Sequence, residues 1–344
     1  MMELTPRKRA VLEAVVKTYI KTGEPVGSKN LAALLKNAPS SATIRNEMNE
    51  LCSMGFLDQP HTSAGRIPTS MGYRFYIDSL MKNGSVSNNA KRTVDAALSS
   101  RSADPGSIPK LACGALVSLT GLPALSIYLA GEGTTLRAVK TMTLGRRSVA
   151  LLMITSDGRT GSRVCRLPSD VDEKAMERFT EIVKDRLLYR PLTEFGKAQL
   201  QSIAALTGDR MFTLLPLFSE LFEMAHGAGR TTAELYGGDR LYGFCDDRTA
   251  KKTALLIREV EPILKIVGND EKNLKVVFGS DTDYPELCGK VFATAPCFTS
   301  GRYCGRIGVI GSGRMSYDEI IPSIEYAAGA ASDCMTRAEK DMED

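Results

Sequence analysis

Side chains that can read the edges of nucleic-acid bases gather in one stretch, residues 40–55 (SSATIRNEMNELCSMG). Arginine carries paired donors that match guanine, and the asparagine amide carries a donor and an acceptor that match adenine. Arg45, Asn46 and Asn49 supply both types on neighbouring positions. We therefore predict a helix that enters a DNA major groove. The alternative is an ordinary surface helix with polar filler.

The same stretch has the pattern of a single amphipathic helix. An inward apolar stripe recurs at spacings of four and three residues, at Ile44, Met48 and Leu51. Ser40 or Ser41 can cap the helix by accepting the free amides of its first turn, and Gly55 ends it. The outer face is short and hydrogen-bonding, unlike the long Glu and Lys of most solvated faces; it comprises Ala42, Arg45, Asn46, Asn49 and Ser53.

Two predicted helices precede this one and complete a helix-turn-helix. Thr5 followed by Pro6 is typical of a helix start, and the apolar pattern runs to about residue 20. Ser28 begins a second, short helix with leucines facing inward, and residues 36–39 form a tight connection. A short helix, a turn and a polar-faced helix are the pattern of a DNA-binding helix-turn-helix.

A compact polar loop after the third helix predicts a wing. Residues 56–59 and 67–69 are strand-like, and residues 60–66 between them are small and polar. Backbone amides and hydroxyls of such a loop can lie against phosphates, while Arg66 at its tip or His61 reaches the minor groove. His61 is alternatively a turn residue bonded to its own loop. The predicted phosphate-positioning residues are Lys29, Ser40, Ser41, Thr43, Thr62, Ser63 and Arg66. A helix over 70–81 is expected to pack its aromatic residues against this module.

Positive charge is concentrated at the N-terminal end of the chain. Residues 1–82 hold 11 Lys and Arg against 7 Asp and Glu, whereas residues 83–344 hold 33 against 33. A basic head on a neutral body is typical of a nucleic-acid-binding protein, although a chance excess is the alternative. The composition, 43% hydrophobic and 24% charged, is that of a soluble globular protein of two or three domains. We expect no membrane segment and no signal peptide.

Catalytic, metal and cofactor sites are not predicted. Eight cysteines are scattered without a C-x-x-C pair, which indicates reduced thiols in the cytoplasm. Neither His61 nor His226 lies at ligand spacing from a cysteine or is a credible catalytic base. Residues 308–313 (GVIGSG) look like a phosphate loop, but three residues separate them from the next helix, which favours a simple strand-to-helix turn. We predict a protein that is not an enzyme and needs no cofactor.

The remaining chain predicts an α+β domain with a helical insertion. We expect a linker over 83–106 holding at most one short helix, then a helix and four strands up to residue 167. Residues 168–229 are helical, and strands and helices return over 230–344. The predicted helix over 212–225 is apolar on more than one face, so we expect a partner subunit to cover its second apolar face. The predicted dimerisation residues are Phe212, Leu215, Phe218, Leu221 and Phe222. The alternative is a helix buried within its own domain.

Five segments carry a resemblance to a known family: GEPVGSKNL (23–31), SSATIRNEMNEL (40–51), QPHTSAGRIPT (59–69), GYRFYID (72–78) and GRIGVIGSGRMSYDEIIPSIEY (305–326). They closely resemble the heat-inducible transcription repressors called HrcA. The resemblance implies a winged helix at residues 1–82, followed by a GAF-like domain interrupted by a dimerising insertion. It also implies a homodimer that binds an inverted-repeat DNA operator and represses chaperone operons, with the GroE chaperonin keeping it active. Such a repressor is cytoplasmic, and nucleoid-associated when bound to its operator.

Two other function classes are open on the residues alone. The first is a winged-helix repressor that senses a small molecule through the GAF-like domain, and a metabolite that shifts the melting temperature would favour it. The second is an adaptor whose winged helix binds protein. The adaptor predicts no salt-dependent affinity for DNA, whereas phosphate contacts make affinity fall steeply with salt.

Overall fold

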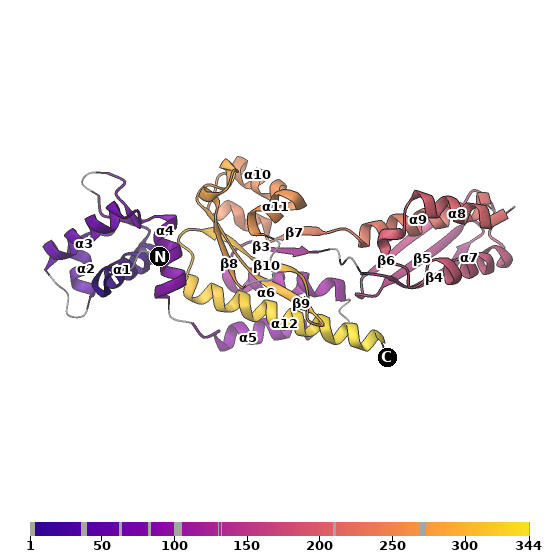
Figure 1. The fold of residues 1–344 in the computed structure, drawn as a ribbon, viewed down its shortest axis with the longest axis horizontal. Helices are drawn as coiled ribbons and strands as arrows, with labels where there is room; N and C mark the ends of the chain where they lie inside the picture. Colours follow the sequence, from indigo (N-terminus) through magenta and orange to yellow (C-terminus); the bar gives the residue numbers. More distant parts are fainter. Residues whose placement is uncertain are drawn as a thin grey trace.

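Three bodies lie in a row along the long axis of the computed structural model (Figure 1). It describes residues 4–35, 40–61, 64–81, 84–99, 105–129, 131, 133–208, 211–268 and 273–343. A helical head with a small two-stranded sheet lies at one end, a five-stranded body in the centre, and a three-stranded sheet with helices at the other end. Among the described residues, no helix combines the length and apolar character that a membrane span requires.

The head has the predicted winged-helix elements. They are α1 (Pro6–Thr22), α2 (Ser28–Leu34), α3 (Ser41–Ser53), β1 (Leu57–Asp58), β2 (Ile67–Pro68), α4 (Ser70–Phe75) and a π-type turn over Tyr76–Leu80. Thr5 caps α1 as expected, since its hydroxyl accepts from the amide of Lys8. Ser28 is the first residue of α2 rather than its cap, because Gly27 takes the extended capping conformation without a side-chain bond. The strands β1 and β2 pair antiparallel, so the wing prediction is confirmed.

The central body is a five-stranded antiparallel sheet with helices on both faces. Its strand order is β7-β3-β10-β9-β8. The strands are β3 (Ala124–Tyr128), β7 (Thr232–Tyr236), β8 (Lys275–Phe278), β9 (Lys290–Thr299) and β10 (Arg302–Ser312). Successive residues alternate between two cores: Val309 faces α5 (Asn88–Leu98), α6 (Ile108–Thr120) and α12 (Tyr317–Glu343), whereas Ile310 faces α10 (Asp247–Arg258) and α11 (Val260–Val267). This arrangement confirms the α+β prediction.

Two segments of the central body differ from expectation. The apolar pattern of residues 249–267 predicts one helix, but the structure has two, because Glu259 between α10 and α11 adopts an extended conformation. The expected linker contains α5, which belongs to the body: Val94 is fully buried, and the Tyr326 hydroxyl on α12 donates to Asp95 at 2.8 Å. The polar composition around α5 suggested a linker, but an amphipathic helix needs only a narrow apolar stripe to dock.

The third body is larger than the predicted insertion. The strands β4 (Leu136–Gly145), β5 (Ser148–Thr155) and β6 (Thr160–Arg166) form their own antiparallel sheet, separate from the central one. One face of this sheet packs on α7 (Glu173–Arg186), α8 (Lys197–Thr207) and α9 (Met211–Ala228). The boundary predicted at residue 168 is therefore wrong, since these strands lie with the helices that follow them. Alternating polarity identifies a half-buried strand but not the sheet that it joins.

Helix α9 is covered within its own chain, which corrects the dimerisation prediction for three of its residues. Phe218, Leu221 and Phe222 are buried in the core of the third body. The ring of Phe218 lies 4.7 Å from that of Phe179 on α7, and Phe222 lies 5.1 Å from Phe195. A sheet on one side and helices on the other bury both apolar faces, so these side chains have no surface left for a partner. Phe212 is 78% exposed and Leu215 is half-buried.

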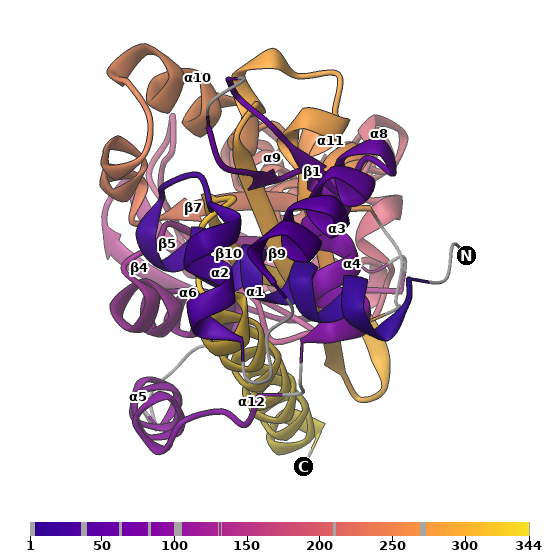
Figure 2. The same cartoon turned by 90° about the vertical axis from the view of Figure 1, so that its left-hand side faces the viewer.

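The head docks on the central body through α4. The ring of Tyr73 stacks on Phe278 at 5.9 Å and meets Tyr317 at 5.7 Å. Burial raises the pKa of the Tyr73 hydroxyl. Arg74 forms an ion pair with Asp281. The sequence predicts that the aromatic residues of this helix pack against the head; Tyr73 does so and also joins the cores of both bodies into one cluster. Figure 2 looks along the long axis, with the head in front of the central sheet.

The glycine-rich segment 308–313 serves this packing. A Cβ at Gly308 would lie 2.0 Å from the carbonyl oxygen of Ala293, so only glycine allows β9 to approach β10 here. A Cβ at Gly313 would lie 3.5 Å from the Tyr73 ring, which places this turn against the head. The strand continues to Ser312, and the turn that follows brings Arg314 against Gly23 at the end of α1.

Candidate nucleic-acid interface

Helix α3 presents three of the predicted base-reading residues on its free side. Ile44, Met48 and Leu51 are buried in the head, as the spacing predicts. Arg45, Asn46 and Asn49 are all exposed on the opposite side. Within the described residues, neither Arg45 nor Asn46 has a side-chain partner that would occupy its donors or acceptor.

Two further contacts fix the position of α3: the cap at its start and ion pairs to α1. The Ser40 hydroxyl accepts from the backbone amide of Thr43 at 3.1 Å and contacts the Thr43 hydroxyl at 2.9 Å. Lys8 on α1 pairs with Glu47 at 3.1 Å and with Glu50 at 2.7 Å. The hydrogen bonds to Glu50 and Glu47 raise the pKa of Lys8. Lys8 on α1 thus contacts the glutamate side of α3, while Arg45, Asn46 and Asn49 stay exposed on another side.

Arg66 lies at the base of the wing rather than at its tip, which corrects the sequence prediction. Its backbone exchanges two hydrogen bonds of 2.9 Å with Val26, next to the start of α2. Its guanidinium turns back toward α3, where Nη2 donates to Oδ1 of Asn49 at 2.6 Å. The strand β2 begins only at Ile67, and no local pattern indicates that Arg66 pairs with Val26, 40 residues earlier in the chain.

The other predicted contact residues lie around this centre. Lys29 on α2 and Ser41 at the start of α3 are exposed, and Thr43 is half-buried beneath the cap. The His61 side chain is exposed, and its carbonyl accepts from the amide of Ala64, so His61 takes part in a turn. Thr62 and Ser63 lie outside the described residues. A hollow of about 230 Å³ is lined by residues of the wing base, of α2 and its preceding turn, and of α3.

Sequence reasoning missed several residues that build this surface. Val26 and Gly65 join the wing to α2, and a Cβ on Gly65 would lie 2.5 Å from the Val26 backbone. Lys8 holds the rear of α3, and Tyr73 holds the head on the body. The spacing of Gly65 directly before Arg66 is the only local signal, since a glycine marks close backbone approach.

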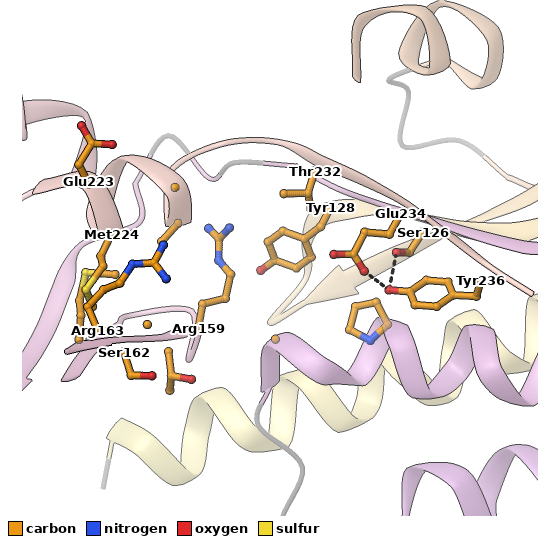
Figure 3. Close-up of a pocket in the computed structure, with 17 residues that line it drawn as sticks. Ser126, Tyr128, Arg159, Ser162, Arg163, Glu223, Met224, Thr232, Glu234 and Tyr236 are labelled. Carbon is orange, nitrogen blue, oxygen red and sulfur yellow. Dashed lines mark hydrogen bonds between the residues drawn. The ribbon is translucent and has the colours of Figure 1, made fainter. Parts of the chain in front are cut away.

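A second hollow, of about 390 Å³, lies where the insertion joins the central sheet (Figure 3). Figure 3 shows Arg159 and Arg163 from the insertion opposite Tyr128 and Glu234 from the sheet. Arg159 pairs with Asp157 at 2.8 Å and lies 4.8 Å from the Tyr128 ring, while Tyr236 donates to Glu234. Arg159 is therefore paired with an acid of its own hairpin, and Arg163 is exposed at the rim. We assign these residues to the contact between the insertion and the central sheet rather than to a small-molecule site.

Comparison with known proteins agrees with this geometry. Residues 3–79 match the model of the winged helix-turn-helix transcription repressor HrcA DNA-binding domain, and residues 109–321 match that of the HrcA protein C-terminal domain. The chain belongs to the HrcA family. The family is one of heat-inducible transcription repressors, and its winged-helix DNA-binding domain is the head described above.

Curated HrcA proteins are similar to this chain over almost its whole length. The heat-inducible transcription repressor HrcA of Acetivibrio thermocellus is 26% identical, covering 94% of each chain. That of Pelotomaculum thermopropionicum is 28% identical, covering 98% of each. A crystal structure described as a hypothetical protein at 2.2 Å resolution has the same fold, with a TM-score of 0.72, 23% identity, and coverage of 98% of this chain and 100% of that one.

The described part of the chain holds no cluster of His, Cys, Asp and Glu able to bind a metal ion. All eight cysteines are free thiols. Burial raises the pKa of Cys113 and of Cys165, so these thiols behave as core residues.

Replacing Ser40 by Ala is expected to loosen the first turn of α3, whereas Ser41→Ala is the matched control. Loss of an N-cap hydroxyl costs about 1 kcal/mol, which corresponds to roughly five-fold faster opening of the local amides. Amide hydrogen exchange over residues 42–47 of the full chain measures this local opening. A larger effect of Ser41→Ala would contradict the assignment of Ser40 as the cap.

Proposed function

We propose that this chain is a sequence-specific, homodimeric repressor of chaperone operons that binds an inverted-repeat operator. The observation that carries the proposal is the exposure of Arg45, Asn46 and Asn49 on α3, opposite the side that is buried in the head. Two such helices related by a two-fold axis match the symmetry of an inverted repeat. The protein acts in the cytoplasm, associated with the nucleoid when the operator is bound.

Each side chain of the surface has a proposed role. Arg45 reads guanine through paired donors, and Asn46 reads adenine through its amide. The phosphate backbone is positioned by Lys29, Ser40, Ser41, Thr43, Thr62 and Ser63, and His61 reaches the minor groove. Burial of Ile44 and Met48 makes the helix a rigid support for these contacts.

Replacing Asn46 by Ala is expected to weaken binding to the operator by about 1–3 kcal/mol and to relax the preference at one base pair in each half-site. The probe is the DNA that the wild-type protein protects from cleavage upstream of chaperone genes. Asn88→Ala, an exposed asparagine on α5, is the matched control and should bind like the wild type. Equal weakening on every sequence would make Asn46 a backbone contact instead. Wild-type binding that does not fall with salt would contradict DNA binding altogether.

The outer face of the insertion sheet is the proposed dimer surface. The cross-strand row Met142–Ala150–Val164 lies on the face turned away from the helices. Met142 is 62% exposed and Val164 70% exposed, with Leu152 beside them. An apolar sheet face of this kind is typical of an interaction surface. Phe212 and Leu215 on α9 remain proposed contributors, whereas Phe218, Leu221 and Phe222 do not.

Replacing Val164 by Glu is expected to convert the dimer to monomers, because a charge in each copy would be buried without a partner. Leu255→Glu, at an equally exposed leucine on α10 in the central body, is the matched control. Sedimentation equilibrium measures the molecular mass, and a Phe212→Ser variant tests the α9 contribution. A dimer that survives Val164→Glu, or a wild-type protein that is monomeric while it binds the operator tightly, would contradict this surface.

The GroE chaperonin is the proposed regulator. The resemblance to HrcA proteins supports this partnership, and the exposed apolar row of the insertion gives it a physical basis. A monomer that leaves Met142 and Val164 uncovered is prone to aggregate until it pairs. Occupation of the chaperonin by misfolded clients would then lower the amount of active dimer.

Adding purified chaperonin with ATP to freshly refolded protein is expected to raise the fraction that binds the operator. The active fraction is measured by titration with operator DNA at a concentration far above the Kd. The same chaperonin without ATP is the control. No gain in the active fraction would contradict regulation through folding assistance.

A further inference from the structure

The contact between Arg66 and Asn49 joins the wing to the recognition helix. The Nη2 atom of Arg66 donates to Oδ1 of Asn49 at 2.6 Å across 17 residues of sequence. A guanidinium has only donors, so the amide oxygen of Asn49 must face it and the amide nitrogen must point away. The orientation of this amide is therefore fixed by chemistry, although oxygen and nitrogen have similar shapes.

Arg66 is itself held in place from several directions. Its backbone exchanges two hydrogen bonds with Val26, and its Nη1 atom approaches the carbonyl of Ala64 at 3.4 Å. Its Nε atom is buried. The Cys52 thiol on α3 lies beside it: burial raises the pKa of Cys52, and the Arg66 charge partly offsets that rise. A side chain with this many constraints does not swing freely to follow a phosphate.

The contact divides the three exposed residues of α3 into two types. Bidentate recognition of adenine needs the amide oxygen to accept from N6 and the amide nitrogen to donate to N7. Asn46 has both atoms free among the described residues. The oxygen of Asn49 faces Arg66, so its outward group is the amide nitrogen, which is a donor. Guanine presents two adjacent acceptors to such a donor, O6 and N7, and thymine presents O4, whereas adenine places the N6 donor beside its N7 acceptor and needs the oxygen that Arg66 holds.

We propose that Arg66 is a positioning residue that sets the base preference of Asn49, so that Asn49 reads an acceptor on guanine or thymine rather than adenine. This inference rests on the proposed DNA-binding function and adds a specific code to it. The wing then contributes to specificity through the recognition helix, without itself touching the base.

The test measures affinity for a panel of duplexes that carry every single base-pair substitution in one half-site of the protected DNA. The full-length wild type, Asn49→Ala, Asn49→Asp, Arg66→Met and the double variant Asn49→Ala/Arg66→Met are compared. Arg66→Met keeps the aliphatic stem but removes the donors. Asn49→Asp keeps an acceptor for Arg66 but has no outward donor, and it tests the inference even where Arg66→Met disturbs the wing.

We expect Asn49→Ala and Asn49→Asp to flatten the preference at one base pair, where the wild type discriminates by roughly 5- to 150-fold in favour of guanine or thymine. Arg66→Met should shift the preference at that same base pair toward adenine, because the freed amide regains both atoms. The effects of Asn49→Ala and Arg66→Met on affinity should not be additive at that base pair. Asn46→Ala should act on a different base pair, and its effect should add to that of either variant.

Three results would overturn the inference. Arg66→Met could weaken all duplexes equally and lower the salt slope by about 1, which is the behaviour of a phosphate contact. The wild type could prefer adenine at the base pair that Asn49→Ala flattens. Asn49→Asp could keep the wild-type preference. A wild-type protein that discriminates among no sequences would instead refute the proposed function itself, and the inference with it.

Discussion

The packing of Tyr73 between Phe278 and Tyr317 determines where the head sits on the rest of the chain. Without it, the head would hang on the segment that follows α4 and could adopt many orientations. Because Tyr73 is buried in a core shared by the head and the central body, the head has one arrangement. The Arg74–Asp281 ion pair is a second contact between the same two bodies. Under the proposed dimeric binding mode, which places two helices at a set separation on DNA, the relative position of the bodies matters as much as the helix itself.

The sides of helix α3 make different kinds of contact. One side is buried in the head, and a second is pinned to α1 through Lys8 and two glutamates. The third carries two short asparagine side chains, Asn46 and Asn49, beside the longer Arg45, and all three are exposed. The wing meets this third side through Arg66, so the surface that faces DNA consists of two elements in mutual contact rather than one helix alone.

The sequence predicted the parts of this fold that local pattern determines. The helix boundaries of the head, the wing strands and the strands β8, β9 and β10 follow from hydrophobic period and turn residues, and they lie near the expected positions. Contacts between elements that are far apart in the sequence could not be predicted from local pattern. Nothing local to β4, β5 and β6 says that they avoid the central sheet, and nothing local to α9 says that its second apolar face is covered by α7. The same holds for Arg66, whose backbone partner and side-chain partner both come from other elements.

The insertion leaves and re-enters the central sheet at neighbouring positions. Tyr128 at the end of β3 pairs directly with Thr232 at the start of β7. Topologically, the whole third body therefore takes the place of a hairpin turn between two adjacent strands. Its size and shape can change over evolutionary time without altering the register of any strand in the central sheet. If the insertion holds two copies together as proposed, changes in it would alter the spacing of the two heads while the central sheet stays the same.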